Sequence, residues 1–424
     1  MRSLAIVLTM LLTSVVHAPG PDRVAVVVYL KDRADLGAVP PGDRRLRRQR
    51  VVGELHRVAD RAQASLLRLL DAERRRGVVT GVRRLWNVNA IALTTTRELA
   101  DAIARRPEVA SVAADETAFA PVGQIEVNLT QSGAPGLWSL GLRGTGVVVA
   151  NVDTGVDVTH PDLAARWRGG PNSWFDPNGE HVTPADVSGH GTWTMGVMAG
   201  GDASGAAIGV APDTTWIAAK AFDDGGVATT SGLHAIFQWL LDPDGDPATD
   251  DAPDVVNNSW AFSAKGCNLT FEPDLAALRA IGILPVFAAG NGGPYAAGSY
   301  SPANNPSAFS VGVVNGADTI LSMSSRGPST CGGRTGVFPD LVASGKDIWT
   351  SDLYGMWTTA TGTSMAAPHV GGVLALLLSG KPGRTPGQQA AALVAGAHDL
   401  GVPGPDNTYG AGRLDAVATW NALP

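Results

Sequence analysis

The chain of 424 residues is 44% hydrophobic, 17% charged and 6% aromatic, the composition of a folded protein with room for more than one core. Its 52 glycines follow no Gly-X-Y repeat and its long apolar run stands at the N-terminus, which excludes collagen-like and multi-span membrane proteins. The net charge of −7 divides into +7 over residues 1–120 (20 Lys and Arg, 13 Asp and Glu) and −14 over residues 121–424 (12 and 26). The acidic part argues against a nucleic-acid partner, and the opposite signs suit an intramolecular complex.

Residues 1–18 follow the order of a secretory signal peptide. Arg2 is followed by an apolar run at 4–12 and by Val16-His17-Ala18, which supplies small residues for cleavage. The alternative is a buried N-terminal strand or helix. The longest later apolar run, 373–378, has only the length of a core helix segment. We therefore expect a secreted, extracellular protein without a membrane anchor.

Residues 19–120 predict a small domain of their own. Runs of β-branched and apolar residues indicate strands, apolar positions at helical spacing indicate helices, and the expected order is strand 24–30, helix 51–76, strand 85–95, helix 97–106 and strand 109–113. This order suits an α+β domain of ferredoxin-like type. The arginine-rich stretch 44–50 is either a nucleic-acid patch or a solvated helix face, and the export signal favours the second.

From Gly146 onward, apolar strand-like runs alternate with helical ones. The expected strands are 147–152, 216–220, 255–258, 284–289 and 309–314, and the expected helices are 233–241, 273–281, 364–379 and 386–397. This alternation predicts an α/β fold with a parallel sheet that helices cover on both faces. In such sheets, reactive side chains gather beyond the carboxyl ends of the strands.

Three short stretches place reactive side chains at such positions. Asp153 ends a predicted strand in Val152-Asp153-Thr154-Gly155, His190 opens a small-residue helix in Ser188-Gly189-His190-Gly191-Thr192, and Ser364 begins the long apolar helix in Gly362-Thr363-Ser364-Met365-Ala366. Each residue alone is most often structural, as a strand-end Asp, a loop His or a helix N-cap. Their order along the chain is one of those in which the catalytic triad of serine hydrolases occurs.

Over roughly residues 121–421 the chain resembles the subtilisin-like serine proteases, or subtilases (S8 peptidase family), with local similarity to the bacillopeptidase F group. The motifs that carry the resemblance are Asp153-Thr154-Gly155, His190-Gly191-Thr192, Asn257-Asn258-Ser259-Trp260, Ala288-Ala289-Gly290-Asn291 and Gly362-Thr363-Ser364-Met365-Ala366. The resemblance implies a subtilisin-like fold and a serine endopeptidase that acts on polypeptides through an acyl-enzyme. It implies no cofactor for the chemistry.

The chemistry of the residues agrees with this implication. A serine hydroxyl is a poor nucleophile, so His190 would take the proton of Ser364 while Asp153 fixes the imidazole tautomer. The tetrahedral oxyanion needs donors, which the side chain of Asn291 and the backbone N–H of Ser364 would supply. Loss of one such donor typically costs about 3 to 4 kcal/mol of transition-state stabilisation. By itself, Asn291 could equally be a turn residue in a glycine-rich loop.

The resemblance also indicates how substrate binds. Ser259-Trp260-Ala261 and Gly226-Val227-Ala228 would be edge strands that pair with an extended peptide. The side chain of Trp260 could instead be ordinary core packing, and the sequence leaves both interpretations open. Residues 298–300 would shape the first specificity pocket.

The basic N-terminal segment resembles the inhibitor-type propeptide of these proteases at Trp86-Asn87-Val88-Asn89-Ala90. The implied organisation is a signal peptide at 1–18, a propeptide at 19–120 that inhibits the enzyme and assists folding, and a catalytic domain at 121–424. The family pattern places the cut between about Ala118 and Asn128. We expect a monomer.

The sequence does not decide whether the chain has a disulfide or a calcium site. Cys267 and Cys331 would either pair under oxidising conditions or remain two buried thiols. Asp162 matches a calcium-ligand position of the family, but Ala203 stands where relatives carry an amide ligand. The acidic loop 242–246 lacks the glycine and glutamate of an EF-hand.

Two other functional classes compete with a protease. A lipase or esterase requires Gly-x-Ser-x-Gly with the acid and the histidine after the serine, whereas here position 366 is Ala and both partners precede Ser364. A catalytically silent binding protein could use the same fold. Such proteins commonly lose a triad member, and this chain retains all three together with Asn291.

Overall fold

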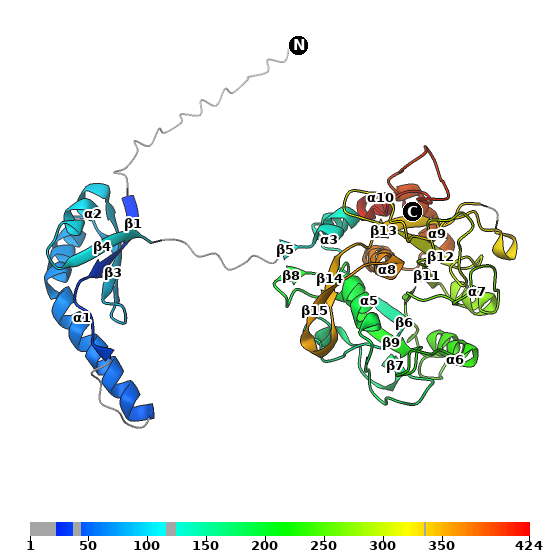
Figure 1. The fold of residues 1–424 in the computed structure, drawn as a ribbon, viewed down its shortest axis with the longest axis horizontal. Coiled ribbons are helices and arrows are strands. Elements are labelled where there is room, and N and C mark those ends of the chain that lie inside the picture. The colour runs from blue at the N-terminus through cyan, green and yellow to red at the C-terminus, as the bar shows by residue number, and fades with distance from the viewer. Residues whose placement is uncertain (1–22, 37–43, 116–123, 335) are drawn as a thin grey trace, which may run out of the picture. The chain divides into compact units, whose positions relative to one another are not determined.

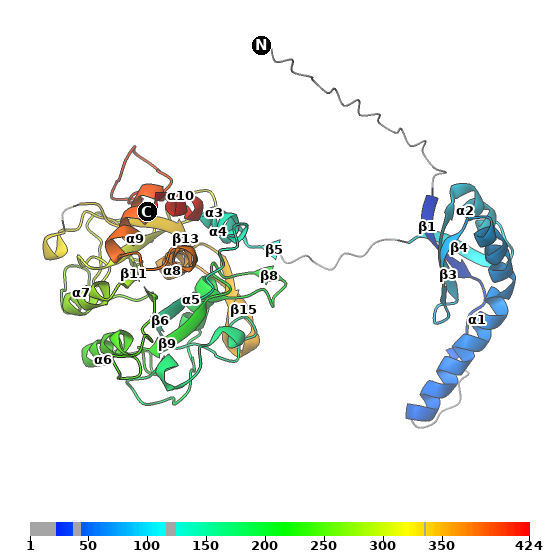
Figure 2. The same cartoon turned by 180° about the vertical axis from the view of Figure 1, so that it is seen from behind.

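The computed structural model describes residues 23–36, 44–115, 124–334 and 336–424, without the side chains of 44–49. The expected signal peptide, residues 118–123 of the expected cleavage region and most side chains of the arginine-rich stretch lie outside the described residues. The chain divides into two compact units, Met1–Ala120 and Pro121–Pro424 (Figures 1 and 2).

The N-terminal unit has the order βαββαβ around one antiparallel sheet with the strand order β2-β3-β1-β4. Its elements are β1 (Arg23–Leu30), α1 (Arg44–Arg75), β2 (Thr80–Leu85), β3 (Ala90–Thr96), α2 (Arg97–Ala104) and β4 (Val109–Ala114). Its own core includes the buried side chains of Val28, Leu66, Leu70, Ile91 and Ile103. Strand order and connectivity are those of a ferredoxin-like α+β unit.

The expectation of one strand over 85–95 was wrong. Residues 86–89 form a turn between β2 and β3, and Asn89 has a left-handed backbone with φ 48°. Asparagine tolerates this conformation better than most residues, which lets the chain reverse inside a run of apolar and β-branched residues.

The second unit is built on a seven-stranded parallel sheet with the order β13-β12-β11-β10-β6-β9-β7. The strands are β6 (Val148–Asp153), β7 (Trp174–Phe175), β9 (Thr215–Lys220), β10 (Val255–Asn258), β11 (Leu284–Ala288), β12 (Phe309–Val314) and β13 (Leu341–Ser344). The expected α/β class with a parallel sheet is confirmed. The expected strands match five of these within one residue at each end, whereas β7 and β13 were missed.

Helices cover both faces of this sheet (Figures 1 and 2). One face packs against α5 (His190–Ala199), α8 (Thr363–Gly380) and α9 (Pro386–Gly396), and the other against α6 (Thr230–Leu241) and α7 (Glu272–Ala280). Successive strand residues point to opposite faces, so Val149 joins the core of α8 while Ala150 joins that of α6. The peripheral elements are α3 (Val127–Ser132), α4 (Ala134–Trp138), α10 (Ala416–Ala422), the β5–β8 pair (Gln124–Ile125, Ala206–Ala207) and the β14–β15 pair (Ile348–Ser351, Trp357–Ala360).

Helix α8 lies in the middle of the unit. By length and apolar composition it is the one helix among the described residues that could cross a membrane, but 83% of it is buried inside the protein. Its apolar residues contact the strands of the central sheet. Burial in the core accounts for its composition.

Candidate active site

The residues singled out from the sequence lie at the carboxyl edge of the parallel sheet. Asp153 is the last residue of β6, His190 is the first residue of α5, and Ser364 is the second residue of α8. Asn291 follows the end of β11 by three residues. Since β6, β10 and β11 run parallel and side by side, their carboxyl ends bring Asp153 and Asn291 to one edge.

Asp153 and His190 are joined directly. Nδ1 of His190 lies 2.7 Å from Oδ1 of Asp153, and the aspartate side chain is 1% exposed. The same oxygen accepts the backbone N–H of Thr154 at 2.8 Å. Gly191 permits this approach, because a Cβ there would lie 2.0 Å from the carbonyl oxygen of Gly155.

The pKa of His190 is raised above its ordinary value. Burial of the imidazole is the largest influence and opposes protonation, but the charge of Asp153 and its hydrogen bond act in the other direction, as does the charge of Asp186. The sum favours the imidazolium. A histidine that takes a proton during the reaction is stabilised by this arrangement in its protonated form.

Asp186 is a functional residue that the sequence reasoning missed. Its Oδ1 accepts the hydroxyl of Thr154 at 3.0 Å and the backbone N–H groups of Ser188 and Gly189, both at 2.9 Å. Its Oδ2 accepts the backbone N–H and the hydroxyl of Thr192 at 2.9 and 2.8 Å. The carboxylate therefore ties the loop before His190 to the end of β6. An aspartate three residues before a glycine is common in loops, so no local pattern singles it out.

Ser364 makes a reciprocal contact with Ser259, which follows β10. Oγ of Ser364 donates to the carbonyl oxygen of Ser259 at 3.2 Å, and Oγ of Ser259 donates to the carbonyl oxygen of Ser364 at 2.9 Å. The side chain of Asn257 supports Ser259 with a further hydrogen bond of 3.1 Å. Among the described residues the hydroxyl of Ser364 thus points to a backbone carbonyl and not to His190.

The amide of Asn291 is oriented by Thr363. Oδ1 of Asn291 accepts both the backbone N–H of Thr363 at 3.0 Å and its hydroxyl at 2.9 Å. The threonine hydroxyl in turn accepts the backbone N–H of Gly290 at 3.2 Å. Because the amide oxygen is occupied, the Nδ2 donor is left for a ligand. Sequence reasoning treated Thr363 only as a neighbour of Ser364.

The two segments expected to bind peptide are not strands in the structure. Ser259, Trp260 and Ala261 lie in a loop after β10, and Gly226, Val227 and Ala228 lie in a loop before α6. The expectation of edge strands was therefore wrong for the unbound chain. The side chain of Trp260 is 8% exposed and packs among aromatic rings at centroid distances of 5.7 to 6.4 Å, from Phe237, Phe271 and Phe287. Its side chain is core packing, so only the backbone of Trp260 is open to a peptide role.

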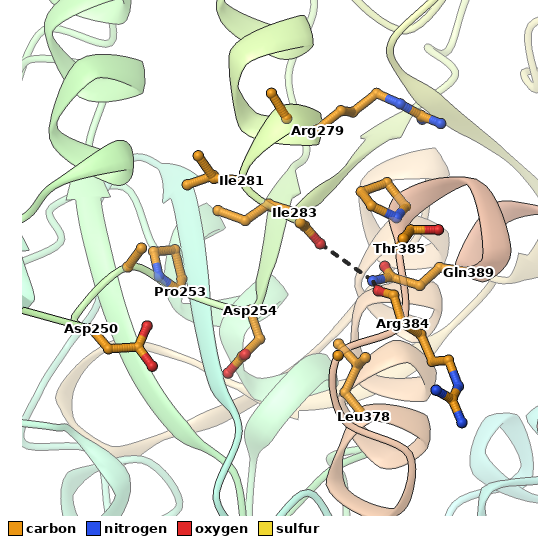
Figure 3. Close-up of a pocket in the computed structure, with 15 residues that line it drawn as sticks. Asp250, Pro253, Asp254, Arg279, Ile281, Ile283, Leu378, Arg384, Thr385 and Gln389 are labelled. Atoms are coloured by element: carbon orange, nitrogen blue, oxygen red, sulfur yellow. Dashed lines mark hydrogen bonds between the residues drawn. The ribbon is translucent and has the colours of Figure 1, made fainter.

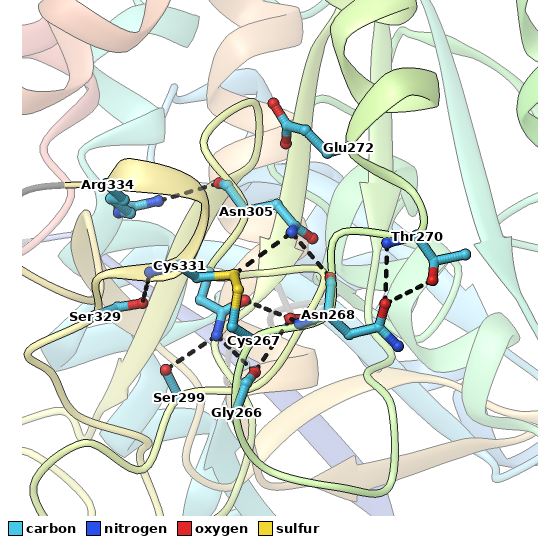
Figure 4. Close-up of a disulfide and its surroundings, with 12 residues drawn as sticks. Gly266, Cys267, Asn268, Thr270, Glu272, Ser299, Asn305, Ser329, Cys331 and Arg334 are labelled. Atoms are coloured by element: carbon cyan, nitrogen blue, oxygen red, sulfur yellow. Dashed lines mark hydrogen bonds between the residues drawn. A yellow bond between two sulfur atoms is a disulfide. The ribbon is translucent and has the colours of Figure 1, made fainter.

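Cys267 and Cys331 form a disulfide (Figure 4). The bond joins the loop after Ala261 to the segment after β12. Nδ2 of Asn305 reaches the backbone of Asn268 at 3.0 Å, and this bond reinforces the connection. The disulfide thus anchors a loop that begins at the active site.

Asp162 does not show the surroundings of a calcium ligand. Its Oδ1 accepts the backbone N–H of Ala203 at 2.6 Å, and its Oδ2 accepts the indole N–H of Trp357 at 2.6 Å. Calcium takes six to eight oxygen ligands, whereas these partners are donors. The residues around Asp162 therefore do not fit the calcium site that the resemblance implied.

A cavity of about 410 Å³ lies at the other end of the sheet (Figure 3). Asp254 and Ile283, which line it, directly precede β10 and β11. Gln389 donates across it to the carbonyl oxygens of Gly282 and Arg384, at 3.3 and 2.6 Å. This position at the amino ends of the strands separates the cavity from Asp153 and His190.

Comparison with known proteins agrees with this geometry. Residues 144–412 match the Peptidase_S8 family, described as the subtilase family. The chain is 33% identical to bacillopeptidase F of Bacillus subtilis over 89% of its own length and 29% of that protein's length, so it spans less than a third of this relative. It is 34% identical to subtilisin E of Bacillus subtilis over 74% of its own length and 77% of that protein's. It is 32% identical to the subtilisin-like protease PopC of Myxococcus xanthus over 58% and 54%.

Proposed function

This chain belongs to the subtilase family of serine endopeptidases, and on that basis we propose that it is an exported endopeptidase made as an inactive precursor. The observation that carries the proposal is the 2.7 Å hydrogen bond between His190 and the buried Asp153. Ser364 lies at the same edge of the sheet, where it contacts Ser259 just after β10. In this assignment Asp153, His190 and Ser364 are the catalytic residues. Asn291 is the oxyanion donor.

The geometry supports the following reaction. Nδ1 of His190 donates to Asp153, so Nε2 is the nitrogen that accepts the proton of Ser364 as its Oγ attacks the scissile carbonyl. The carbonyl oxygen becomes an oxyanion, which Nδ2 of Asn291 and the backbone N–H of Ser364 stabilise. The imidazolium then gives its proton to the leaving amine, and the C–N bond breaks to leave an acyl-enzyme. Water, deprotonated by His190, attacks the ester and releases the acid and free Ser364.

Polypeptides are the substrates in this proposal. An extended peptide would lie along the backbones of Ser259–Ala261 and Gly226–Ala228, which become sheet partners only when it binds. The contact between Ser364 and the carbonyl of Ser259 supports this placement, since it sets the nucleophile beside the first of these segments. No cofactor takes part in the chemistry.

The N-terminal residues supply export and control. Residues 1–18 act as the signal peptide, and residues 19–120 act as an inhibitory propeptide that docks on the acidic catalytic unit. The ferredoxin-like topology of the N-terminal unit and its net positive charge support this role. Removal of the propeptide would release a secreted monomeric enzyme.

The test compares the intact masses of two exported products, one from the precursor with Ser364 and one from Ser364→Ala. We expect only the chain with Ser364 to be cut between about Ala118 and Asn128, because the enzyme is its own first substrate. Labelling by a serine-directed fluorophosphonate is expected in the same sample. Folded protein that is neither cut nor labelled would favour the silent binding protein, and equal cutting of both chains would point to another protease.

A further inference from the structure

A lysine side chain lies next to the oxyanion donor of the proposed mechanism. Nζ of Lys265 donates to the carbonyl oxygen of Gly292 at 2.7 Å, and Gly292 directly follows Asn291. The ammonium lies 5.8 Å from the ring centroid of Tyr295 and 5.9 Å from that of Tyr300. Tyr300 belongs to the segment 298–300 that is expected to shape the first specificity pocket. The cation therefore lies beside a residue of the segment expected to shape that pocket.

The loop that bears Lys265 is held in place around it. Lys265 forms an antiparallel bridge with the second of these tyrosines, and the backbone N–H of Gly266 donates to the carbonyl oxygen of Ser299 at 3.1 Å. The next residue, Cys267, is bonded to Cys331 (Figure 4). A loop fixed in this way loses less conformational entropy when its side chain contacts a substrate.

The position of Lys265 corresponds to one particular substrate residue. The proposed site borders the scissile carbonyl with Ser259–Ala261 on one side and with Asn291 and Gly292 on the other. Lys265 follows Ala261 by four residues, and its ammonium donates to the carbonyl oxygen of Gly292. The oxyanion belongs to the residue on the acyl side of the scissile bond. A side chain of that residue that lies between the two segments would meet the ammonium of Lys265, which already contacts Gly292.

The ammonium has unused hydrogen-bonding capacity. It carries three donors, and the carbonyl oxygen of Gly292 accepts from one of them. In the part of the chain that the structure describes, no carboxylate forms an ion pair with Lys265, whose side chain is exposed. Lys265 is one of 12 Lys and Arg in residues 121–424, whose net charge is −14.

We propose that Lys265 makes this enzyme selective for peptides with an acidic residue on the acyl side of the scissile bond. The inference rests on the proposed endopeptidase activity. A glutamate carboxylate accepts charge-assisted hydrogen bonds from Nζ, while Tyr295 and Tyr300 pack against its methylene groups. A lysine or arginine at the same substrate position meets a like charge and is disfavoured.

The test uses the matured full chain and three internally quenched peptides. They differ only in having Glu, Gln or Lys as the residue on the acyl side of the scissile bond. Fluorophosphonate titration of Ser364 sets the enzyme concentration. We expect kcat/KM for the Glu peptide to exceed that for the Gln peptide about ten-fold. This factor is larger than the effect of an exposed ion pair and smaller than that of a charged hydrogen bond fully shielded from water. Lys265→Met should bring the ratio to about one, Lys265→Arg should retain it, and Lys265→Glu should favour the Lys peptide. Arg384→Met removes the same charge at the far cavity and should leave the ratio unchanged (Figure 3).

Three results would overturn the inference. Equal cleavage of the Glu and Gln peptides by fully titrated enzyme would remove the specificity and leave the proposed function standing. A Glu preference that persists in Lys265→Met would assign the selectivity to another residue. If the fluorophosphonate labels no serine and no peptide is cut, the inference and the proposed function are both contradicted.

Discussion

At the scale of single residues, Thr363 decides whether the amide of Asn291 can act as an oxyanion donor. We predict that Thr363→Val lowers kcat about ten-fold with little change in KM, because one of the two hydrogen bonds that orient the amide is lost. Asn291→Ala should cost more, about 100- to 1000-fold, since it removes the donor itself. Thr363→Ser retains the hydroxyl and serves as the control. Steady-state kinetics check this, and a Thr363→Ser variant as slow as Thr363→Val would contradict it.

Asp186 acts on the proton affinity of His190. The negative charge of Asp186 raises the pKa of His190, so Asp186→Asn should lower that pKa. His190 must be neutral to accept a proton, and activity is lost as the pH falls through its pKa. The acid limb of the kcat/KM profile should therefore move to lower pH in Asp186→Asn.

This shift separates an electrostatic role from a merely structural one. Asparagine keeps one side-chain oxygen for the loop before His190, and a loss of loop structure alone would lower kcat/KM at every pH. Asp274→Asn removes a carboxylate that pairs with His234 instead, and is the control. An acid limb that stays in place in Asp186→Asn would show that its charge does not reach His190.

Single residues also show which parts of the site sequence motifs can predict. Asp153, His190 and Ser364 could be chosen from the sequence because their order and flanking residues are distinctive. Asp186 and Thr363 could not, because their importance lies in hydrogen bonds across the fold. The carboxylate of Asp162 accepts a hydrogen bond from Trp357, which is 195 residues away in the sequence, and no local pattern predicts that contact.

At the scale of elements, a buried histidine links α3 to α8. Nδ1 of His369 donates to the carbonyl oxygen of Met365 at 2.7 Å, so Nε2 is the nitrogen that accepts from Nδ2 of Asn128 at 2.8 Å. Burial lowers the pKa of His369 to about 4 from 6.5. In the unfolded chain, His369 is therefore protonated below about pH 6.5. In the folded chain it stays neutral until the pH falls to about 4.

We predict that this difference makes the free energy of unfolding fall as the pH falls from 6.5 to about 4, and stop falling on its account below that. The gap between the two pKa values corresponds to about 3 kcal/mol. His369→Gln does not titrate and should show a shallower pH dependence, whereas the exposed His398→Gln should match the wild type. Denaturant unfolding of fluorophosphonate-inactivated enzyme measures this. Identical slopes in His369→Gln and wild type would contradict the assignment.

Elements were predictable where periodicity was long and uniform. The core helix α8 and the six-residue strand β12 follow from mainly apolar runs, as burial on all sides requires. Strand β7 has two residues, too few for a pattern to stand out from the loops around it. Length does not explain why β13 was missed, because β10 also has four residues and was predicted. The turn at 86–89 was missed because Trp86 and Val88 continue the apolar character of the flanking strands.

At the scale of the whole molecule, two units with separate cores carry opposite charge. Residues 19–120 hold 19 Lys and Arg against 13 Asp and Glu, a net charge of +6, and residues 121–424 have a net charge of −14. Separate cores mean that the N-terminal unit is not needed to fill the core of the catalytic unit. If it inhibits, it does so as a partner that associates, and association between opposite charges depends on ionic strength.

We therefore predict that residues 19–120, added to the mature enzyme, inhibit it more weakly as salt is raised. Between about 0.1 M and 1 M ionic strength the screening length falls from about 10 Å to about 3 Å, so the long-range attraction is lost and the inhibition constant rises. Hydrolysis of an uncharged peptide without the inhibitor, at the same salt concentrations, controls for effects on the enzyme itself. An inhibition constant independent of salt would contradict the prediction, because it would mean that the attraction between the opposite charges of the two units does not contribute to the complex.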